Sequence, residues 1–226
     1  MVFLVPLLFL PATRSTKTTW SSGATVPHAG IFASIRDGFV VIRSNRSVAF
    51  SLISQTVLFV SLGALWVVGL ARIQSVLPAG KTFHLSIVAS SGTIGLLAGA
   101  AAASLGKRMA ANRLVGICAL GIAIAWVGLA RSASLPALSA WTLVLGLATS
   151  PVFIVTETLL QSDTPVTYRG RVFSGREVWT KFGFLIGSSL ATLADAIVTR
   201  EFVMIAVGVL LAVLGVVLER KNFLRV

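Results

Sequence analysis

The chain is short of the residue types from which most catalytic, metal-binding and cross-linked sites are built. Its 226 residues include one cysteine, Cys118, and two histidines, His28 and His84, which lie far apart. A disulfide framework is therefore excluded, and no Cys/His spacing typical of a metal site occurs. Only seven residues are acidic, and no paired acid and base or Ser/His arrangement indicates an enzyme. We therefore predict a protein that is not an enzyme and carries neither a cofactor nor a metal ion.

Charged residues of both signs are also scarce. They form 12% of the chain, whereas soluble domains average about 25%. Hydrophobic residues form 56% of the chain, and the mean hydropathy is +0.93. A water-soluble globule of this size could not bury so much apolar surface. The sequence therefore predicts that the lipid bilayer is the main partner of the chain.

Six long apolar runs are separated by short clusters of basic residues. Each run has roughly the 17 to 25 residues that a tilted transmembrane helix needs. We therefore predict an all-α membrane protein with a six-helix transmembrane domain over residues 47–218. The predicted helices span residues 47–71, 83–105, 114–130, 135–160, 178–198 and 202–218.

The formal net charge of +12 could indicate nucleic-acid binding. However, fifteen of the nineteen Lys and Arg residues fall in alternate loops and tails, so they form no single basic face. The positive-inside rule then places the N-terminus and the C-terminus in the cytoplasm. We expect a multi-pass protein of the cell (plasma or inner) membrane and no nucleic-acid partner. Trp66, Trp126 and Trp141 are expected at the outer ends of their helices, as an aromatic belt.

The segments that flank the transmembrane domain are shorter or less apolar. Residues 1–11 contain a run of nine apolar residues that is too short to span hydrocarbon and has no preceding Lys or Arg. We interpret it as a truncated helix end or an interfacial segment. Residues 12–46 are predicted to be a cytoplasmic linker with an amphipathic surface helix over 31–46. Residues 219–226 are predicted to be a cytoplasmic tail.

The six predicted helices divide into two triplets. The middle helix of each triplet is rich in small residues, at 92–106 and at 183–194. Small residues allow transmembrane helices to approach closely. A basic loop follows the first of these helices and precedes the second, which is the arrangement of two inverted three-helix repeats.

Two loops carry the residues on which a family resemblance rests. The sequence GAAAASLGKR at 99–108 keeps the glycines and the final basic pair of the pattern G-x-L-a-D-r-x-G-r-r, but has Ala103 in place of the aspartate. This stretch resembles the loop between the second and third helices of each half of a major facilitator superfamily transporter. The matching residues are Gly99, Gly106, Lys107 and Arg108.

The second loop begins at Thr164-Pro165 and continues through Arg169, Gly170 and Arg171. It is similar to the loop before the eleventh helix in the drug and siderophore exporter branch of that superfamily. Residues 35–46 resemble the central cytoplasmic loop of the same branch. The resemblance covers roughly residues 31–221 and implies a C-terminal half of the twelve-helix fold, in which the substrate path lies between two six-helix halves.

The resemblance implies a secondary transporter that exports small amphipathic compounds, driven by the proton gradient. A small-molecule substrate is therefore expected as a partner, together with a missing N-terminal transporter half or a second copy of the chain. The chain would be a fragment, a split-gene product or a half that pairs with another chain. The alternative is a non-transporting membrane interaction protein derived from a transporter half.

Three polar residues inside the predicted helices or directly after one are candidates for substrate binding or coupling. Glu157 is the only acidic residue well inside a predicted helix, where it could carry a proton or contact a cationic substrate. Alternatively, it reaches water or a loop arginine near the cytoplasmic end. Gln161 shares its helix face and the same two interpretations. Gln55 could line the path or form a hydrogen bond between helices.

The basic loop residues have two interpretations. Arg169 and Arg171, like Lys107 and Arg108, could latch against a facing helix in one transport state. They could instead anchor their loops to anionic headgroups. The absence of the family's aspartate at Ala103 weakens the latch interpretation for the first loop.

Overall fold

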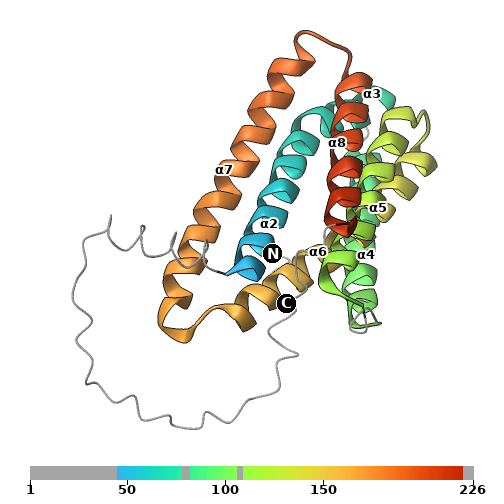
Figure 1. Cartoon of the computed structure of the whole chain (residues 1–226). Helices are drawn as coiled ribbons and strands as arrows, with labels where there is room; N and C mark the ends of the chain where they lie inside the picture. Colours follow the sequence, from blue (N-terminus) through green and yellow to red (C-terminus); the bar gives the residue numbers. More distant parts are fainter. Residues whose placement is uncertain (1–44, 78–81, 106–108, 221–226) are drawn as a thin grey trace.

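The computed structural model describes residues 45–77, 82–105 and 109–220, in which every regular element is a helix (Figure 1). The predicted segment 1–11, the linker up to residue 44 and the loop residues Gly106, Lys107 and Arg108 lie outside the described residues. The elements are α2 (Arg46–Ala64), η2 (Leu65–Gly69), α3 (Leu70–Val76), α4 (Thr82–Leu105), α5 (Ala111–Arg131), α6 (Leu135–Asp163), η4 (Val166–Tyr168), α7 (Arg169–Asp195) and α8 (Arg200–Arg220).

Within the described ranges, five helical segments are long and apolar enough to cross a membrane. This finding confirms the all-α prediction for these residues and supports several membrane crossings. The five segments are Arg46–Val76, Phe83–Ala103, Ala111–Arg131, Leu135–Asp163 and Arg200–Val217.

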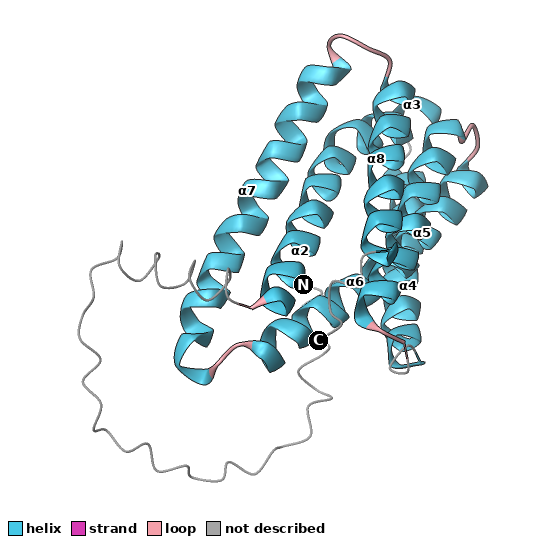
Figure 2. Cartoon of the chain, in the orientation of Figure 1, coloured by secondary structure: helices cyan, strands magenta, loops and turns pink. Residues whose placement is uncertain are grey.

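Helix α7 is not one of these five segments, although the sequence predicts a transmembrane helix at 178–198. The helix begins at Arg169 and ends at Asp195. Its first half also carries Arg176 and Lys181, and these charges lower its average hydropathy. Figure 2 shows that α7 is nevertheless as long as its neighbours and runs beside α2.

Helix α2 continues through η2 into α3, so that residues 46–76 form one long helix with a π-helical segment. Asn45 caps its start: the side-chain oxygen accepts hydrogen bonds from the backbone N–H groups of Ser47 and Val48, at 3.0 and 3.4 Å. The Asn45 amide also donates to the Asp163 carbonyl, at 2.9 Å. The beginning of α2 is therefore tied to the end of α6.

Each helix packs against a small set of partners. Helix α4 packs on α6, α5 lies against both α6 and α8, and α2 packs on α6 and α7. In Figure 1, α7 and α2 lie on one side of the domain, whereas α4, α5 and α8 gather on the other. Helix α6 packs on helices of both sides and is the main connection between them.

Close helix contacts depend on glycines, as the small-residue pattern predicts. A Cβ atom on Gly95 of α4 would overlap with the Leu143 carbonyl of α6. A Cβ atom on Gly187 of α7 would likewise overlap with the Val60 carbonyl of α2. These backbones approach closely only because no side chain stands between them.

The core lies around α5, where Trp126 is fully buried. Its indole nitrogen donates a hydrogen bond to the Ser61 hydroxyl of α2, at 2.9 Å. The prediction of Trp126 as a belt residue is therefore wrong, because its one polar atom is satisfied inside the protein. Trp66 is 67% exposed, as a residue in contact with lipid or interface would be.

Candidate functional site

Gln55 of α2 is the centre of a polar cluster that joins three helices. The side chain is completely buried, and its amide nitrogen donates to the Thr156 hydroxyl at 3.1 Å and to Glu157 Oε2 at 3.3 Å. Its amide oxygen accepts a hydrogen bond from Arg176 Nε, at 2.7 Å. Both ends of the amide are therefore satisfied, with partners on α6 and α7.

The cluster contains an ion pair between helices. Arg176 Nη2 lies 3.1 Å from Glu157 Oε2, and the two side chains are 18% and 30% exposed. Arg176 Nη1 also pairs with Glu177, at 3.2 Å. Gln161 donates to the other oxygen of Glu157, at 3.4 Å. We call this set the Gln55 cluster; its members are Gln55, Thr156, Glu157, Gln161, Arg176 and Glu177.

Local helix geometry places these groups. The Thr156 hydroxyl donates to the Val152 carbonyl one turn earlier, at 2.6 Å, which leaves its oxygen free to accept from Gln55. Glu157 and Gln161 are four residues apart on α6 and therefore share a face. The cluster thus uses one helical turn of α6 and one long arginine side chain from α7.

The cluster lies inside the helix domain, away from the helix ends. Gln55 is nine residues from the start of α2, a distance of about 14 Å along the helix axis. Glu157 is six residues before the end of α6, a distance of about 9 Å. Both residues therefore lie about two helical turns inside the ends of their helices.

One side of α7 continues the polar character of the cluster. Ser174, Glu177, Lys181, Ser188 and Thr192 recur at intervals of three, four or seven residues, and all but the half-buried Ser188 are exposed. This spacing places them on one side of a helix, and we call them the α7 polar stripe. Leu185, which is 59% exposed, lies on the same side between Lys181 and Ser188, so the stripe is not continuous. The other exposed side is mainly apolar: it comprises Trp179, Phe182, Ile186, Leu190 and Leu193, with the exposed Ser189 among them.

The charged members distinguish the α7 polar stripe from an ordinary lipid-facing surface. The hydroxyls of Ser174, Ser188 and Thr192 donate to carbonyls of their own helix, so they are compatible with lipid. Lys181 is different, because it is exposed and no described residue pairs with its ammonium group. It lies five residues beyond Arg176, about 8 Å deeper along α7.

The predicted loop residues of α7 lie apart from the cluster. Arg169 Nε donates to the Thr164 carbonyl at 3.2 Å, and the Arg171 guanidinium lies 6.0 Å from the centre of the Tyr168 ring. A Cβ atom on Gly170 would meet nothing within 4 Å. These contacts stabilise the turn between α6 and α7.

Gly99, the one of the four matching residues of the first loop motif that the structure describes, is a packing residue. It is buried against α6, and an added Cβ atom would lie 3.0 Å from the Ser150 Cβ atom. The remaining motif residues Gly106, Lys107 and Arg108 are not among the described residues.

The structure thus brings together Gln55, Glu157 and Gln161, three candidates named from sequence. It adds Arg176, a basic residue that follows the second loop motif and to which the sequence assigns no role. Its position in the sequence indicates a helix: it lies seven residues, or two helical turns, after Arg169, and an apolar run follows it. Basic residues directly before such a run can belong to the first turns of the same helix. A lone buried carboxylate also requires a cationic partner.

A second group of ion pairs lies at the opposite end of the helices. Arg72 of α3 pairs with Glu201 of α8 at 3.1 Å, and Asp195 pairs with Arg200 at 3.0 Å. Glu201 is 53% exposed, so this group is open to solvent or headgroups. These residues join helix ends, and Asp195 is a helix-terminus residue, in line with its sequence position.

No protein-family model matches the sequence, and a search of curated proteins finds no relative at a significant level. Within residues 45–77, 82–105 and 109–220, no three His, Cys, Asp or Glu side chains gather where they could hold a metal ion. The site is therefore interpreted from its own geometry: a charge pair and an unpaired lysine on one side of an apolar helix domain.

Proposed function

We propose that this chain forms one wall of a small-molecule path through the membrane, as the C-terminal half of a secondary transporter similar to the major facilitator superfamily. The observation that carries the proposal is the Gln55 cluster, continued by Lys181 along α7. A lysine or carboxylate at the centre of a membrane helix costs about 2.5–3.5 kcal/mol on insertion scales. Such groups are retained where they face water or other protein groups, and a substrate path supplies both.

Helix packing supports the finer proposal of six transmembrane helices in two inverted three-helix repeats. Suppose that α2, α4 and α5 correspond to α6, α7 and α8. The α4–α6 contact then corresponds to the α7–α2 contact, and the α5–α8 contact corresponds to itself. The correspondence is partial, because α5 packs on α6 whereas α8 meets the helix of residues 46–76 mainly at η2. The glycines agree with this exchange, since Gly95 and Gly146 lie in one contact and Gly187 and Gly63 in the other.

The charge arrangement suggests how protons would be coupled to transport. Arg176 neutralises Glu157 in the structure, and both side chains are partly exposed. Protonation of Glu157 would remove its attraction for Arg176, which still has Glu177 within 3.2 Å. The Arg176 side chain would then move toward Glu177 on its own helix, and α6 and α7 would lose the ion pair that joins them. Export of small amphipathic compounds by this route follows from the family resemblance.

One observation favours the alternative of a non-transporting membrane interaction protein. The Gln55 amide is fully hydrogen-bonded and Glu157 is paired, so the cluster needs no ligand to satisfy its polar groups. The polar stripe could then contact a second membrane protein permanently. In both cases the face that bears Lys181 is covered by something other than lipid.

Photo-crosslinking in native membranes tests the common part of these proposals. The photoreactive residue p-benzoylphenylalanine replaces Lys181 or Thr192 on the polar stripe, and Ile186 or Leu190 on the apolar side as matched controls. We expect protein adducts from the first pair and lipid adducts only from the second. Lipid adducts from all four positions would contradict both candidate functions.

A transport assay separates the two candidates. The chain is reconstituted in proteoliposomes with the protein captured by crosslinking, and a proton gradient is imposed in the presence of ethidium or fluorescein as amphipathic probes. The transporter proposal predicts gradient-driven movement of a probe that Glu157→Gln abolishes. Crosslinking without any such movement would favour the interaction protein. Transport by the chain alone would contradict the half-transporter proposal.

A further inference from the structure

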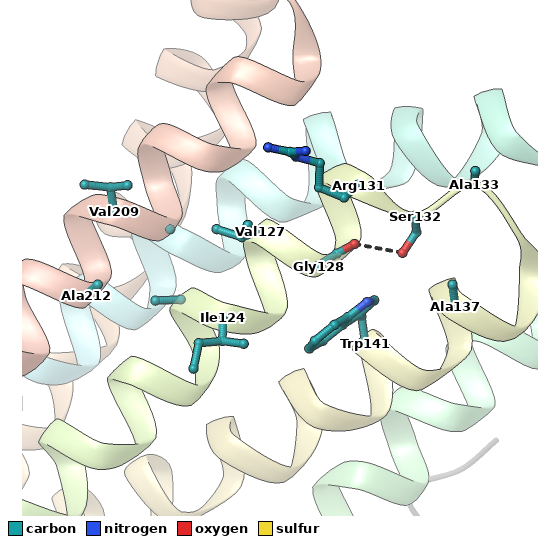
Figure 3. A pocket seen from close by; sticks show the side chains of 12 residues that line it. Ile124, Val127, Gly128, Arg131, Ser132, Ala133, Ala137, Trp141, Val209 and Ala212 are labelled. Carbon is teal, nitrogen blue, oxygen red and sulfur yellow. Dashed lines mark hydrogen bonds between the residues drawn. The ribbon is translucent and has the colours of Figure 1, made fainter.

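A groove runs along the outer face of α5, between α6 and α8, far in sequence from the Gln55 cluster (Figure 3). Its volume is about 550 Å³. Ile124 and Val127 of α5 and Val209 of α8 line one part, and Trp141 of α6 lines another. The lining along the helix axis is apolar, so it offers water few hydrogen bonds but favours contact with a hydrocarbon chain.

Small residues create the groove. A Cβ atom on Gly128 would overlap with the Trp141 ring, so the indole lies directly against the α5 backbone. A Cβ atom on Gly208 would lie 3.0 Å from the Ala123 carbonyl oxygen, so α8 also approaches the α5 backbone closely on the other side. The two flanking helices therefore form the walls of the groove, and the α5 backbone is uncovered at Gly128 between them.

One end of the groove is polar, and it coincides with the end of the α5 helix. Arg131 lies in the last turn of α5 and lines the groove, is exposed, and has no partner among the described residues. The neighbouring Ser132 hydroxyl is already used, since it donates to the Gly128 carbonyl at 2.8 Å. Figure 3 shows the indole nitrogen of Trp141 at the end of its ring nearer to Ser132 and Ala137.

We propose that this groove binds an anionic phospholipid, with one acyl chain along α5 and the phosphate at Arg131. The polarity of the groove matches such a lipid along its length: apolar for most of the helix, then a guanidinium and an indole N–H where the helix ends. Arginine forms paired hydrogen bonds with phosphate oxygens, and tryptophan is favoured at the level of the ester groups. A packed helix from another protein would fill the floor but would leave Arg131 without an anion.

Native mass spectrometry of the purified full chain, titrated with phosphatidylglycerol or phosphatidylcholine, tests the proposal. We expect retained phosphatidylglycerol adducts that Arg131→Gln weakens roughly fivefold, since one basic residue near a membrane surface contributes about that factor. Ala212→Phe and Ala137→Phe, which fill the groove from α8 and α6, should each abolish the adduct. Arg113→Gln, at the opposite end of α5, is the matched control and should leave binding unchanged.

Each other outcome would overturn the proposal. An equal loss in Arg131→Gln and Arg113→Gln would show that lipid binds by general charge attraction. Retention of phosphatidylglycerol in both filled variants would place the acyl chain elsewhere. A dimer that Ala212→Phe dissociates, without any specific lipid adduct, would mean that a second copy of the chain occupies the groove. The thermal unfolding of each variant in detergent shows whether it remains folded.

Discussion

Helices α5 and α7 differ in how they satisfy their polar groups. Helix α5 lies between α6 and α8, and its segment from Leu114 to Ala130 has no charged residue. Its buried polar link is the hydrogen bond from Trp126 to Ser61. Helix α7 packs mainly on α2 and carries Arg176 and Lys181 within its length.

This difference concerns what stabilises each helix. On α5, apolar side chains and glycines meet neighbours on several sides, and the packing itself stabilises the helix. On α7, one glycine-containing side holds the helix against α2, while the rest is divided between an apolar side and the polar stripe. Charges that weaken membrane insertion are concentrated on α7, which packs mainly on one helix, and a path or a partner would meet them there.

The largest expected loss of stability comes from a substitution in the contact between α7 and α2. Gly187→Leu would push the added side chain into the Val60 carbonyl and separate α7 from α2. Overpacking of this kind costs about 1–3 kcal/mol, and we expect the upper end because the obstacle is backbone. Thermal unfolding in detergent should show the loss. Gly170→Leu is the control, because nothing lies within 4 Å of its Cβ position; equal losses in the two variants would contradict the packing role.

The next largest effect concerns the charge pair. Arg176→Met removes the partner of Glu157 and of the Gln55 amide oxygen. The pair is partly exposed, so the loss should be about 2 kcal/mol, between the values for surface and buried pairs. The double variant Arg176→Met/Glu157→Gln should recover part of that loss in the same unfolding assay. If Glu157→Gln does not reduce the cost of Arg176→Met, the ion pair does not stabilise the α6–α7 contact.

A smaller loss of stability is expected from a substitution in the core at α5. Trp126→Phe keeps most of the buried ring but removes the hydrogen bond to Ser61. The expected loss is about 1 kcal/mol, the usual net contribution of one hydrogen bond. Trp66→Phe, at a position that is 67% exposed, should change the unfolding temperature little. A larger loss at Trp66 than at Trp126 would contradict the assignment of α5 to the core.

The smallest effect belongs to the exposed ion pairs at the other end. Glu201→Gln removes the partner of Arg72, but Glu201 is 53% exposed. Exposed pairs contribute about 0–1 kcal/mol and are weakened by salt. We therefore expect a small shift in unfolding temperature that disappears at high ionic strength. A loss as large as that of Arg176→Met would remove the distinction between the two ends.

Hydropathy predicts α4, α5, α6 and α8 to within a few residues, because each is a contiguous apolar run. The prediction 135–160, for example, corresponds to Leu135–Asp163. It misses the first nine residues of α7, since Arg169 to Lys181 read as a loop when only apolarity is counted. Their helical conformation depends on packing against α2 and α6, which no local pattern contains.

The candidate site is predictable in part for a similar reason. Glu157 and Gln55 stand out because polar residues are rare inside apolar runs. The two residues are 102 positions apart in sequence, and their hydrogen bond depends on the packing of α2 against α6. Arg176 gives a weaker signal, since only its spacing from Arg169 and the apolar run that follows it distinguish it from the other basic residues of its loop. The buried position of Trp126 is likewise set by its neighbours.

The central claim is that the α7 polar stripe faces a water-accessible path and not lipid. Lys181→Cys and Ile186→Cys, each in a Cys118→Ser background, lie on the two exposed sides of the same helix, five residues apart. Their reaction with a hydrophilic maleimide is measured in native membranes. We predict rapid labelling at position 181 and little at position 186. Equal protection of both positions, or faster labelling at 186, would contradict the claim.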